Sequence, residues 1–158
     1  MVITRHSAAS PDVQRIIGRL DQALLERYEP ADIHGIDGGA FDRAGGYFVI
    51  AAVDGCAAGC GAFRPLDAQV AEIKRMFVEP DFRGRGIAKA IIQHLENEMR
   101  RQGFVTAVLE TGVKQHEAIG LYRRLGYFPI PAFGEYVGFR YSLCFAKGLH
   151  GRAGGDHG

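Results

Sequence analysis

Residues 72–91 read EIKRMFVEPDFRGRGIAKAI, and this stretch decides the fold. Residues 70–78 are apolar or alternate with charged side chains, which predicts a strand. The strand ends before Pro80, because proline has no amide hydrogen to donate to a sheet. Apolar side chains then recur at helical spacing over residues 87–99, and Gly103 is placed to end a helix. A strand, a glycine-rich turn and a long helix in this order indicate a mixed α/β domain.

The turn between the strand and the helix reads RGRGIA at residues 83–88. The first amides of a helix lack partners within the helix and carry partial positive charge, while glycine lets the backbone approach a bulky anion. Such a turn can cradle a diphosphate, and Arg83 and Arg85 add planar donors for phosphate oxygens. The dinucleotide pattern does not fit, since Lys89 stands where it needs glycine, and the Walker pattern is absent. The alternative interpretation is a glycine-rich turn with two solvated arginines.

Cap and turn residues divide the rest of the chain into further elements. Ser10-Pro11-Asp12 is typical of a helix start, because serine caps the first amides and proline fits the first turn. Asp54-Gly55 predicts a two-residue hairpin turn. The predicted strands lie at 2–6, 47–53, 56–64, 70–78, 105–110, 128–130 and 140–145, and the predicted helices at 11–27, 87–99 and 118–125, with a short helix allowed in the glycine-rich connection 29–46.

Length and charge limit the classes of protein to which the chain can belong. Its 158 residues suit one domain, which we expect over residues 1–147, followed by a flexible glycine-rich tail over 148–158. The formal net charge of +1 provides no broad positive field for nucleic acid or an anionic membrane. No apolar run approaches the roughly 20 residues that span a bilayer, and the amino terminus lacks the apolar core of a signal peptide. A cytoplasmic protein without nucleic-acid or membrane partners is expected.

The three cysteines, Cys56, Cys60 and Cys144, do not stand at zinc-site spacing with histidines. On a regular strand Cys56 and Cys60 face the same side, which suits two small buried side chains better than a metal pair. We therefore interpret all three as reduced core thiols and expect no metal site.

Several stretches between about residues 47 and 145 resemble the GNAT superfamily of N-acetyltransferases. Residues 71–73 (AEI) and 76–78 (MFV) open and close the strand, and RGRGIA is similar to the family's R/Q-x-x-G-x-G/A turn. Residues 118–127 (AIGLYRRLGY) are similar to its second cofactor motif. EIKRMFV, LETG, HEAIGLY and YSLCFAK are closer still to a bacterial subfamily whose acceptors are mostly unassigned.

The resemblance implies a single α/β (α+β) domain with a mixed, mostly antiparallel sheet of about six or seven strands and about four flanking helices. It also implies an acetyl-CoA-dependent N-acetyltransferase that binds coenzyme A in a wedge between residues 76–78 and 108–111. The pantetheine arm then pairs with free backbone groups like an added strand. The residues implied to bind the cofactor are Met76, Phe77, Val78, Arg83, Gly84, Arg85, Gly86, Ile87, Ala88, Glu110, Thr111, Gln115, Ala118, Leu121 and Tyr122.

Two residues depart from the usual family pattern. Ala88 stands where glycine is commoner, a substitution that the motif accepts. Gln115 stands where asparagine is usual, and its longer side chain can still donate an amide hydrogen bond.

The transferred acetyl group requires an amine without its proton, and freeing a lysine-like amine at neutral pH costs about 4 kcal/mol. Glu72 is the first candidate for the base, because it lies eleven residues before Arg83, the spacing of the catalytic glutamate in histone-acetylating members. Glu110 is the reserve candidate. The alternative is that Glu72 is a structural carboxylate paired with Lys74 or Arg75, or that a water relays the proton.

The resemblance makes Tyr122 the donor that hydrogen-bonds or protonates the departing thiolate. Its ordinary pKa near 10 lies above that of a thiol, so complete proton transfer runs uphill by about 2 kcal/mol and hydrogen bonding matters as much as protonation. The alternative is that Tyr122 only packs within the apolar stripe of its helix.

The acceptor is expected to be the primary amine of a small molecule or a peptide. Basic residues on or beside the strands could hold a carboxylate on that amine, although solvated surface cations are an equal alternative. Residues 129–136, with two prolines and an aromatic pair, are expected to form a firm wall on the acceptor side. A homodimer is compatible with the resemblance, and the alternative function is a non-catalytic acyl-CoA-binding sensor or regulatory module. The basic residues considered are Arg64, Lys74, Arg75 and Arg140.

Overall fold

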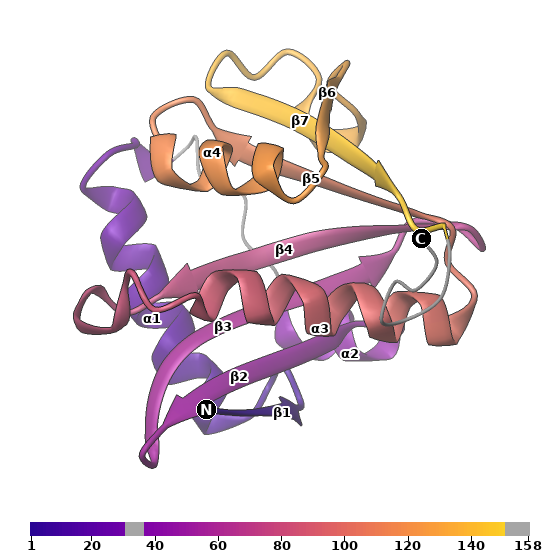
Figure 1. The fold of residues 1–158 in the computed structure, drawn as a ribbon. Coiled ribbons are helices and arrows are strands. Elements are labelled where there is room, and N and C mark those ends of the chain that lie inside the picture. The colour runs from indigo at the N-terminus through magenta and orange to yellow at the C-terminus, as the bar shows by residue number, and fades with distance from the viewer. Residues whose placement is uncertain (31–36, 151–158) are drawn as a thin grey trace.

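The computed structural model describes residues 1–30 and 37–150, which form one seven-stranded sheet with helices on both faces (Figure 1). The strands are β1 (Val2–His6), β2 (Tyr47–Val53), β3 (Cys56–Pro65), β4 (Val70–Val78), β5 (Thr106–Gly112), β6 (Phe128–Ile130) and β7 (Ser142–Gly148). The helices are α1 (Pro11–Leu25), α2 (Gly38–Arg43), α3 (Ile87–Gln102) and α4 (His116–Arg124), with 3₁₀ turns at Pro80–Phe82 and Gly134–Tyr136.

The strands follow the order β1-β2-β3-β4-β5-β7-β6 across the sheet. Every neighbouring pair is antiparallel except β4 and β5, which are parallel. This confirms the predicted mixed, mostly antiparallel α/β fold. No helix within residues 1–30 and 37–150 has both the length and the apolar character to cross a bilayer.

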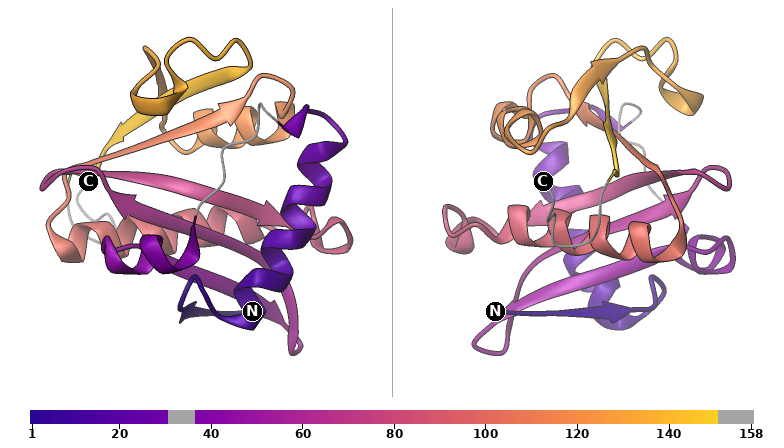
Figure 2. Two further views of the ribbon diagram at one scale, coloured as in Figure 1. Left: turned by 180° about the vertical axis from the view of Figure 1, so that it is seen from behind. Right: turned by 45° about the vertical axis from the view of Figure 1, so that its right-hand side comes forward.

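Helices α1 and α2 cover one face of the sheet, which the left view of Figure 2 brings forward. Ser10 caps α1 as predicted, since its side chain accepts a hydrogen bond from the Val13 amide at 3.3 Å. The buried stripe of α1 packs with Phe41 of α2 and Phe48 of β2. Each such apolar side chain contributes about 1.5–3 kcal/mol when fully buried. The amino-terminal helix is therefore fixed to the sheet by its packed face.

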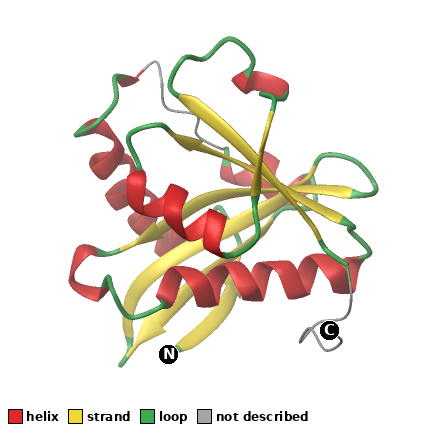
Figure 3. Cartoon of the chain, turned by 45° about the horizontal axis from the view of Figure 1, so that its top comes forward, coloured by secondary structure: helices red, strands yellow, loops and turns green. Residues whose placement is uncertain are grey.

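Helices α3 and α4 cover the other face, and Figure 3 shows α3 lying along the strands. Ile91, Leu95 and Met99 of α3 are completely buried against the sheet. Helix α3 begins at Gly86 and ends at Gly103, both in the left-handed conformation. The two faces of the sheet thus belong to different helices, α1 and α2 on one and α3 and α4 on the other.

Pairing between β4 and β5 stops partway along both strands. Their register begins at Val70 and Thr106 and ends at Ile73 and Leu109, although β4 continues to Val78. Figure 1 shows the two strands close together at one end and apart at the other. The far half of β4 pairs with β3 and the far half of β5 with β7, so the edges that face each other carry no strand pairing.

Strand β4 contains a bulge at Arg75. Its register against β3 shifts between Cys60 and Ala62, so that Arg75 and Met76 stand opposite a single residue. Arg75 has φ of 60°, a left-handed value that is uncommon for a residue with a side chain. Consecutive side chains of a regular strand face opposite sides of the sheet. Because of the bulge, Lys74 and Arg75 instead line the same cavity.

Most predicted element boundaries agree with the structure to within two residues. The two largest differences are at the end of α3, which continues to Gln102, and at the end of the carboxyl-terminal strand, which continues to Gly148. Leu149 is buried, and its amide donates to the Val105 carbonyl. Ordered chain therefore extends past the predicted boundary at residue 147. The rest of the predicted tail, residues 151–158, and residues 31–36 of the predicted connection lie outside the described residues.

The cysteine prediction is correct for two residues and wrong for the third. Cys60 and Cys144 are buried thiols, and burial raises the pKa of Cys60 to about 12. Cys56 is exposed. It is the first residue of β3, directly after the Asp54-Gly55 turn, and Ala57 beside it is exposed as well, so neither face of the strand is buried at this end. Within residues 1–30 and 37–150, no group of three or more His, Cys, Asp or Glu residues is arranged to hold a metal ion.

Candidate active site

A cleft with about 740 Å³ of space, its mouth included, opens where β4 and β5 separate. Its walls come from the unpaired halves of these two strands, from α1 and the turn after it, and from tyrosines that follow later in the chain. The lining residues are Leu20, Leu24, Tyr28, Ile73, Lys74, Arg75, Met76, Glu110, Thr111, Gly112, Gln115, Tyr122, Tyr136 and Tyr141.

The RGRGIA turn lies at the end of β4, directly before α3. Gly84 and Gly86 have φ of 79° and 77°, and a Cβ atom at either position would meet no described atom within 4 Å. Arg83 donates from Nε to the Val78 carbonyl at 3.0 Å, and the Arg85 guanidinium stacks 5.1 Å from the Phe82 ring centre. Open glycines thus leave the amides at the start of α3 approachable, while both arginines are braced against their own turn.

Met76, Phe77 and Val78 lie on the half of β4 past the point of separation. Phe77 and Val78 pair with Cys60 and Gly59 of β3 along one edge of β4. The other edge faces β5 across the gap, and no described strand pairs with it. Free backbone groups at this position suit an extended ligand that adds itself to a strand.

Tyr122 of α4 reaches the cleft from the α3 side of the sheet. Its side chain is buried, and its ring packs edge-on against Tyr127 at 5.9 Å. Burial raises the pKa of the Tyr122 hydroxyl, and the charge of Glu110 raises it further. The phenol therefore keeps its proton at any ordinary pH and can act as a hydrogen-bond donor. The two readings of the sequence, donor and packing residue, are both compatible with this geometry.

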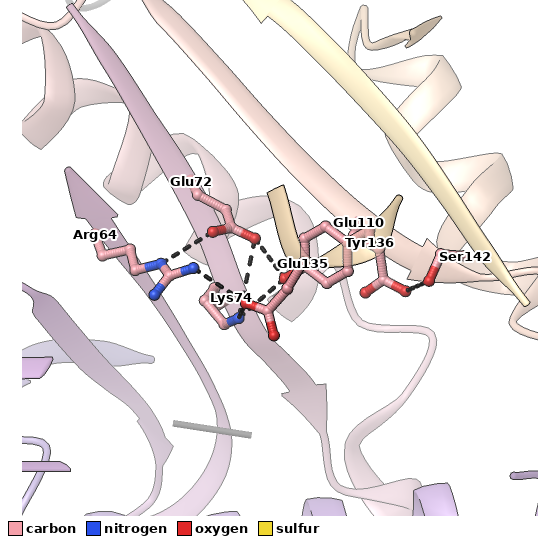
Figure 4. A network of polar contacts seen from close by, with 7 residues as sticks. All are labelled: Arg64, Glu72, Lys74, Glu110, Glu135, Tyr136 and Ser142. Carbon is pink, nitrogen blue, oxygen red and sulfur yellow. Dashed lines mark hydrogen bonds and ion pairs between the residues drawn. The ribbon is translucent and has the colours of Figure 1, made fainter. Parts of the chain in front are cut away.

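Glu110 of β5 lines the same cleft as Tyr122. Its Oε2 atom accepts a hydrogen bond from the Ser142 hydroxyl at 2.7 Å (Figure 4). The charge of Glu110 acts to raise the pKa values of Tyr122, Lys74 and Tyr136, so Glu110 stands among the ionisable groups of the cleft. The structure thus brings the reserve base candidate and the acid candidate together.

Glu72 of β4 is fully buried and is not among the residues that line the cleft. Its Oε1 atom accepts from Arg64 Nε at 3.0 Å, and its Oε2 atom accepts from the Tyr136 hydroxyl at 2.6 Å (Figure 4). Lys74 Nζ stands 3.9 Å from the same carboxylate. This arrangement favours the structural alternative over the base, with Arg64 and Lys74 as partners, whereas Arg75 pairs elsewhere.

Tyr136 separates Glu72 from the cleft. Its hydroxyl donates to Glu72 and accepts from Lys74 Nζ at 2.9 Å, and its ring packs edge-on against Phe133 at 5.2 Å. Burial, and then the charge of Glu72, raise the pKa of Tyr136, so this hydroxyl also stays protonated. The wall expected from residues 129–136 is therefore held to β4 by hydrogen bonds, while the ring packing lies within the wall itself.

Only two of the four basic residues considered for the acceptor line the cleft. Lys74 and Arg75 do so with side chains that are 4% and 6% exposed. Arg64 binds Glu72 from behind the wall, and the exposed Arg140 stacks on the Tyr141 ring at 4.5 Å.

The remaining predicted cofactor residues lie at or near the start of α4. Gln115 is the N-cap position of α4 and lines the cleft, as does Thr111 at the end of β5. Ala118 and Leu121 are partly buried and pack against the α3-side core. Gln115 thus lines the cleft, while Ala118 and Leu121 pack against the core and their contacts with the cofactor stay a prediction.

Sequence reasoning missed three tyrosines of the cleft. Tyr28 and Tyr141 stand 6.0 Å apart, and Lys114 Nζ lies over both rings at 5.5 and 4.9 Å. Gly112 of β5 gives Tyr28 room, since a Cβ there would stand 1.8 Å from its hydroxyl oxygen. Tyr136 was predicted as part of the wall over residues 129–136, but no polar role was predicted for it. No local pattern marks such residues, because they meet only after the chain folds.

Three features of this site are together typical of an acyl-transfer enzyme. They are a parallel strand pair that separates, a glycine turn at the start of a helix, and a buried tyrosine beside a carboxylate. Comparison with known proteins agrees. The description "Acetyltransferase (GNAT) family" matches residues 11–127. This chain belongs to that family and is an acetyl-CoA-dependent N-acetyltransferase.

Three similar proteins illustrate the relationship. The IAA acetyltransferase of Azospirillum brasilense is 33% identical over 150 residues, which are 94% of this chain and 98% of the relative. The crystal structure of a Klebsiella pneumoniae protein assigned as an acyl-CoA N-acyltransferase has a TM-score of 0.79 and 28% identity, covering 94% of this chain and 97% of the other. An aminoglycoside 6'-N-acetyltransferase complexed with coenzyme A shares the fold, with a TM-score of 0.70, 17% identity and coverage of 96% and 99%.

Proposed function

We propose that this enzyme passes an acetyl group from acetyl-CoA directly to the primary amine of a small molecule or a peptide. The observation that carries the proposal is the meeting of Tyr122 and Glu110 in one cleft, at the point where β4 and β5 separate. In this cleft the Tyr122 hydroxyl is a donor that stays protonated, and the Glu110 carboxylate faces the same space. Direct transfer needs both functions within reach of one reacting centre.

The backbone around the cleft fits a ligand shaped like coenzyme A. The free edge of β4 at Met76–Val78 suits the pantetheine arm, and the amides of residues 84–88 suit the diphosphate. The absence of steric hindrance at Gly84 and Gly86 supports this assignment, because phosphate oxygens need a close approach to the amides. When bound, acetyl-CoA supplies the activated acetyl group as a thioester.

Tyr122 is proposed to donate a hydrogen bond to the sulfur as the thioester bond breaks. Its raised pKa makes complete proton transfer to a thiolate more unfavourable than it is for an ordinary tyrosine. We therefore assign to Tyr122 stabilisation of developing negative charge more than outright protonation.

Glu110 is proposed to take the proton of the acceptor amine, directly or through one water molecule. It lines the cleft, while Glu72 is fully buried and contacts the cleft residues Tyr136 and Lys74. Glu72 is instead proposed to orient Tyr136 and Lys74. The sequence favoured Glu72 as the base with Glu110 in reserve, and the proposal reverses that order.

The test is a thiol-release assay with acetyl-CoA and a panel of amino acids, polyamines, aminoglycosides and peptides, with acetylated product identified by mass. We expect thiol release that depends on at least one of these amines and a product heavier by one acetyl group. Coenzyme A binding without release for any amine would instead support the alternative, a non-catalytic acyl-CoA sensor.

A further inference from the structure

We propose that the acceptor of this enzyme is a small amino carboxylate with an apolar or aromatic side chain, whose carboxylate is held by Lys74 and Arg75. This inference rests on the proposed function and adds the chemical class of the acceptor to it. Two buried cations in the lining of the cleft, together with an apolar part of the same lining, carry the inference.

Lys74 retains hydrogen-bonding capacity toward the cleft. Its ammonium has three donors, and its hydrogen bond is to the neutral Tyr136 hydroxyl at 2.9 Å. The carboxylates of Glu72 and Glu135 stand at 3.9 and 3.7 Å from Nζ, which is ion-pair range but longer than a hydrogen bond. Burying an ammonium is costly unless its donors are used, so a ligand carboxylate in the cleft would complete its coordination.

Arg75 carries the second unused donor. Its Nη2 atom pairs with Asp21 of α1 at 3.1 Å, while its buried Nε atom has no hydrogen-bond partner among residues 1–30 and 37–150. The bulge in β4 places Arg75 on the same cavity as Lys74 at the cost of a strained, left-handed backbone. Asp21 is the anionic partner of Arg75 in the structure, and the carboxylate of a bound ligand would take the donor that Asp21 leaves unused.

Part of the cleft is apolar and aromatic. Leu20 and Leu24 of α1 line it together with the rings of Tyr28 and Tyr141. A ligand side chain placed there would bury apolar surface at about 25 cal/mol per Å². Sugars and polyamines gain little from such a wall, because their polar groups would lose water without replacement partners.

The acidic and basic groups define an orientation for the ligand. Glu110 lies within electrostatic range of both Tyr122 and Lys74. With the carboxylate on Lys74 and Arg75, the amine of an amino acid would extend toward Glu110 and the proposed thioester position beside Tyr122. One short zwitterion can therefore satisfy both ends of the cleft.

The decisive experiment compares ligands on the unaltered protein. Acetyl transfer is measured for L-leucine and L-phenylalanine, for the amines that remain when their carboxylates are removed, and for their carboxamides. We expect kcat/KM for the amino acids to exceed that for either analogue without a carboxylate at least tenfold. Equal or faster acetylation of the decarboxylated amines overturns the inference while leaving the proposed function intact. No transfer to any amine overturns both.

Two variants test whether the preference for a carboxylate on the acceptor arises from Lys74 in the cleft. Lys74→Met is expected to lower kcat/KM for the amino acid about tenfold or more, mainly through KM, and to bring the ratio of amino acid to decarboxylated amine close to one. Arg101→Met removes an exposed cation at the far end of α3 and should leave that ratio unchanged. A preference that survives Lys74→Met rules out this residue as the carboxylate's partner. If Lys74→Met folds poorly, the comparison of ligands on the wild-type protein still tests the inference.

Discussion

The hydroxyl of Tyr122 is the single group on which the proposed chemistry depends most. Burial and the nearby charge of Glu110 both favour its neutral form, so the side chain is a permanent donor in the cleft. We expect Tyr122→Phe to lower turnover about tenfold or more, because the departing sulfur loses its hydrogen bond, while coenzyme A affinity is retained. Steady-state kinetics with calorimetric titration of coenzyme A measure the two effects separately. Unchanged turnover would leave Tyr122 with only its packing role.

The two glutamates make opposite predictions about pH. If Glu110 removes the amine proton, the activity lost in Glu110→Gln should be regained as pH rises, since the amine then loses its proton unaided. Glu72→Gln should lower activity by a factor that does not change with pH, because it disturbs Tyr136 and Lys74 instead. The pH profiles of both variants provide the measurement. Recovery at high pH in Glu72→Gln alone would restore the base role to Glu72.

Lys74 should add a pH dependence to acceptor binding. Burial lowers its pKa, against the opposing effect of carboxylates, so it loses its charge at a lower pH than an ordinary lysine. KM for an amino carboxylate should therefore rise with pH before pH 10.5 is reached. Lys74→Arg stays charged and should flatten the rise; the same rise in both proteins would contradict the assignment. The charged and titratable groups around Lys74 are Arg64, Glu72, Arg75, Glu110, Glu135 and Tyr136.

At this scale the sequence predicted the residues whose signal is local. Tyr122 and residues 83–88 stand at fixed places relative to caps and turns, so a pattern could identify them. The contact of Tyr136 with Glu72 joins residues 64 positions apart and has no local signature. The sequence also could not show that Glu72 is buried while Glu110 lines the cleft, since burial depends on which segment covers a strand.

At the scale of elements, the unpaired halves of β4 and β5 and the first turn of α3 form one unit. Residue patterns predicted both strands and the helix, because alternation and helical spacing are properties of each segment. The point of separation and the bulge at Arg75 could not be predicted, since the register depends on neighbouring strands. Gly61 stands opposite the bulge, but it lies on β3 and only the strand pairing brings it there.

Two glycines at opposite ends of α3 offer a matched test. Gly86 and Gly103 both adopt left-handed backbone with open space at the Cβ position. Alanine at either site should cost about 1–2 kcal/mol of unfolding free energy. Only Gly86→Ala should weaken coenzyme A binding, by about tenfold, because only this end is proposed to bind the diphosphate. Denaturant unfolding and calorimetry measure the two effects, and equal coenzyme A affinities in the two variants would argue against the cradle.

At the scale of the whole molecule, the two faces of the sheet contribute different parts of the proposed site. The α3 and α4 side supplies the diphosphate turn and Tyr122, and the α1 side supplies the apolar wall and Asp21, the partner of Arg75. Donor and acceptor would thus approach from opposite faces and meet only through the gap between β4 and β5. A seven-stranded sheet with one incomplete pairing makes this possible without opening the core on either side.

The central claim is that this gap binds coenzyme A. Calorimetric titration of the pure, folded protein with acetyl-CoA tests it most directly, at two temperatures so that a chance enthalpy of zero does not hide binding. The account predicts saturable binding of one acetyl-CoA per chain, weakened by Gly86→Ala and preserved in Tyr122→Phe. A folded protein that takes up no acetyl-CoA at either temperature would contradict it.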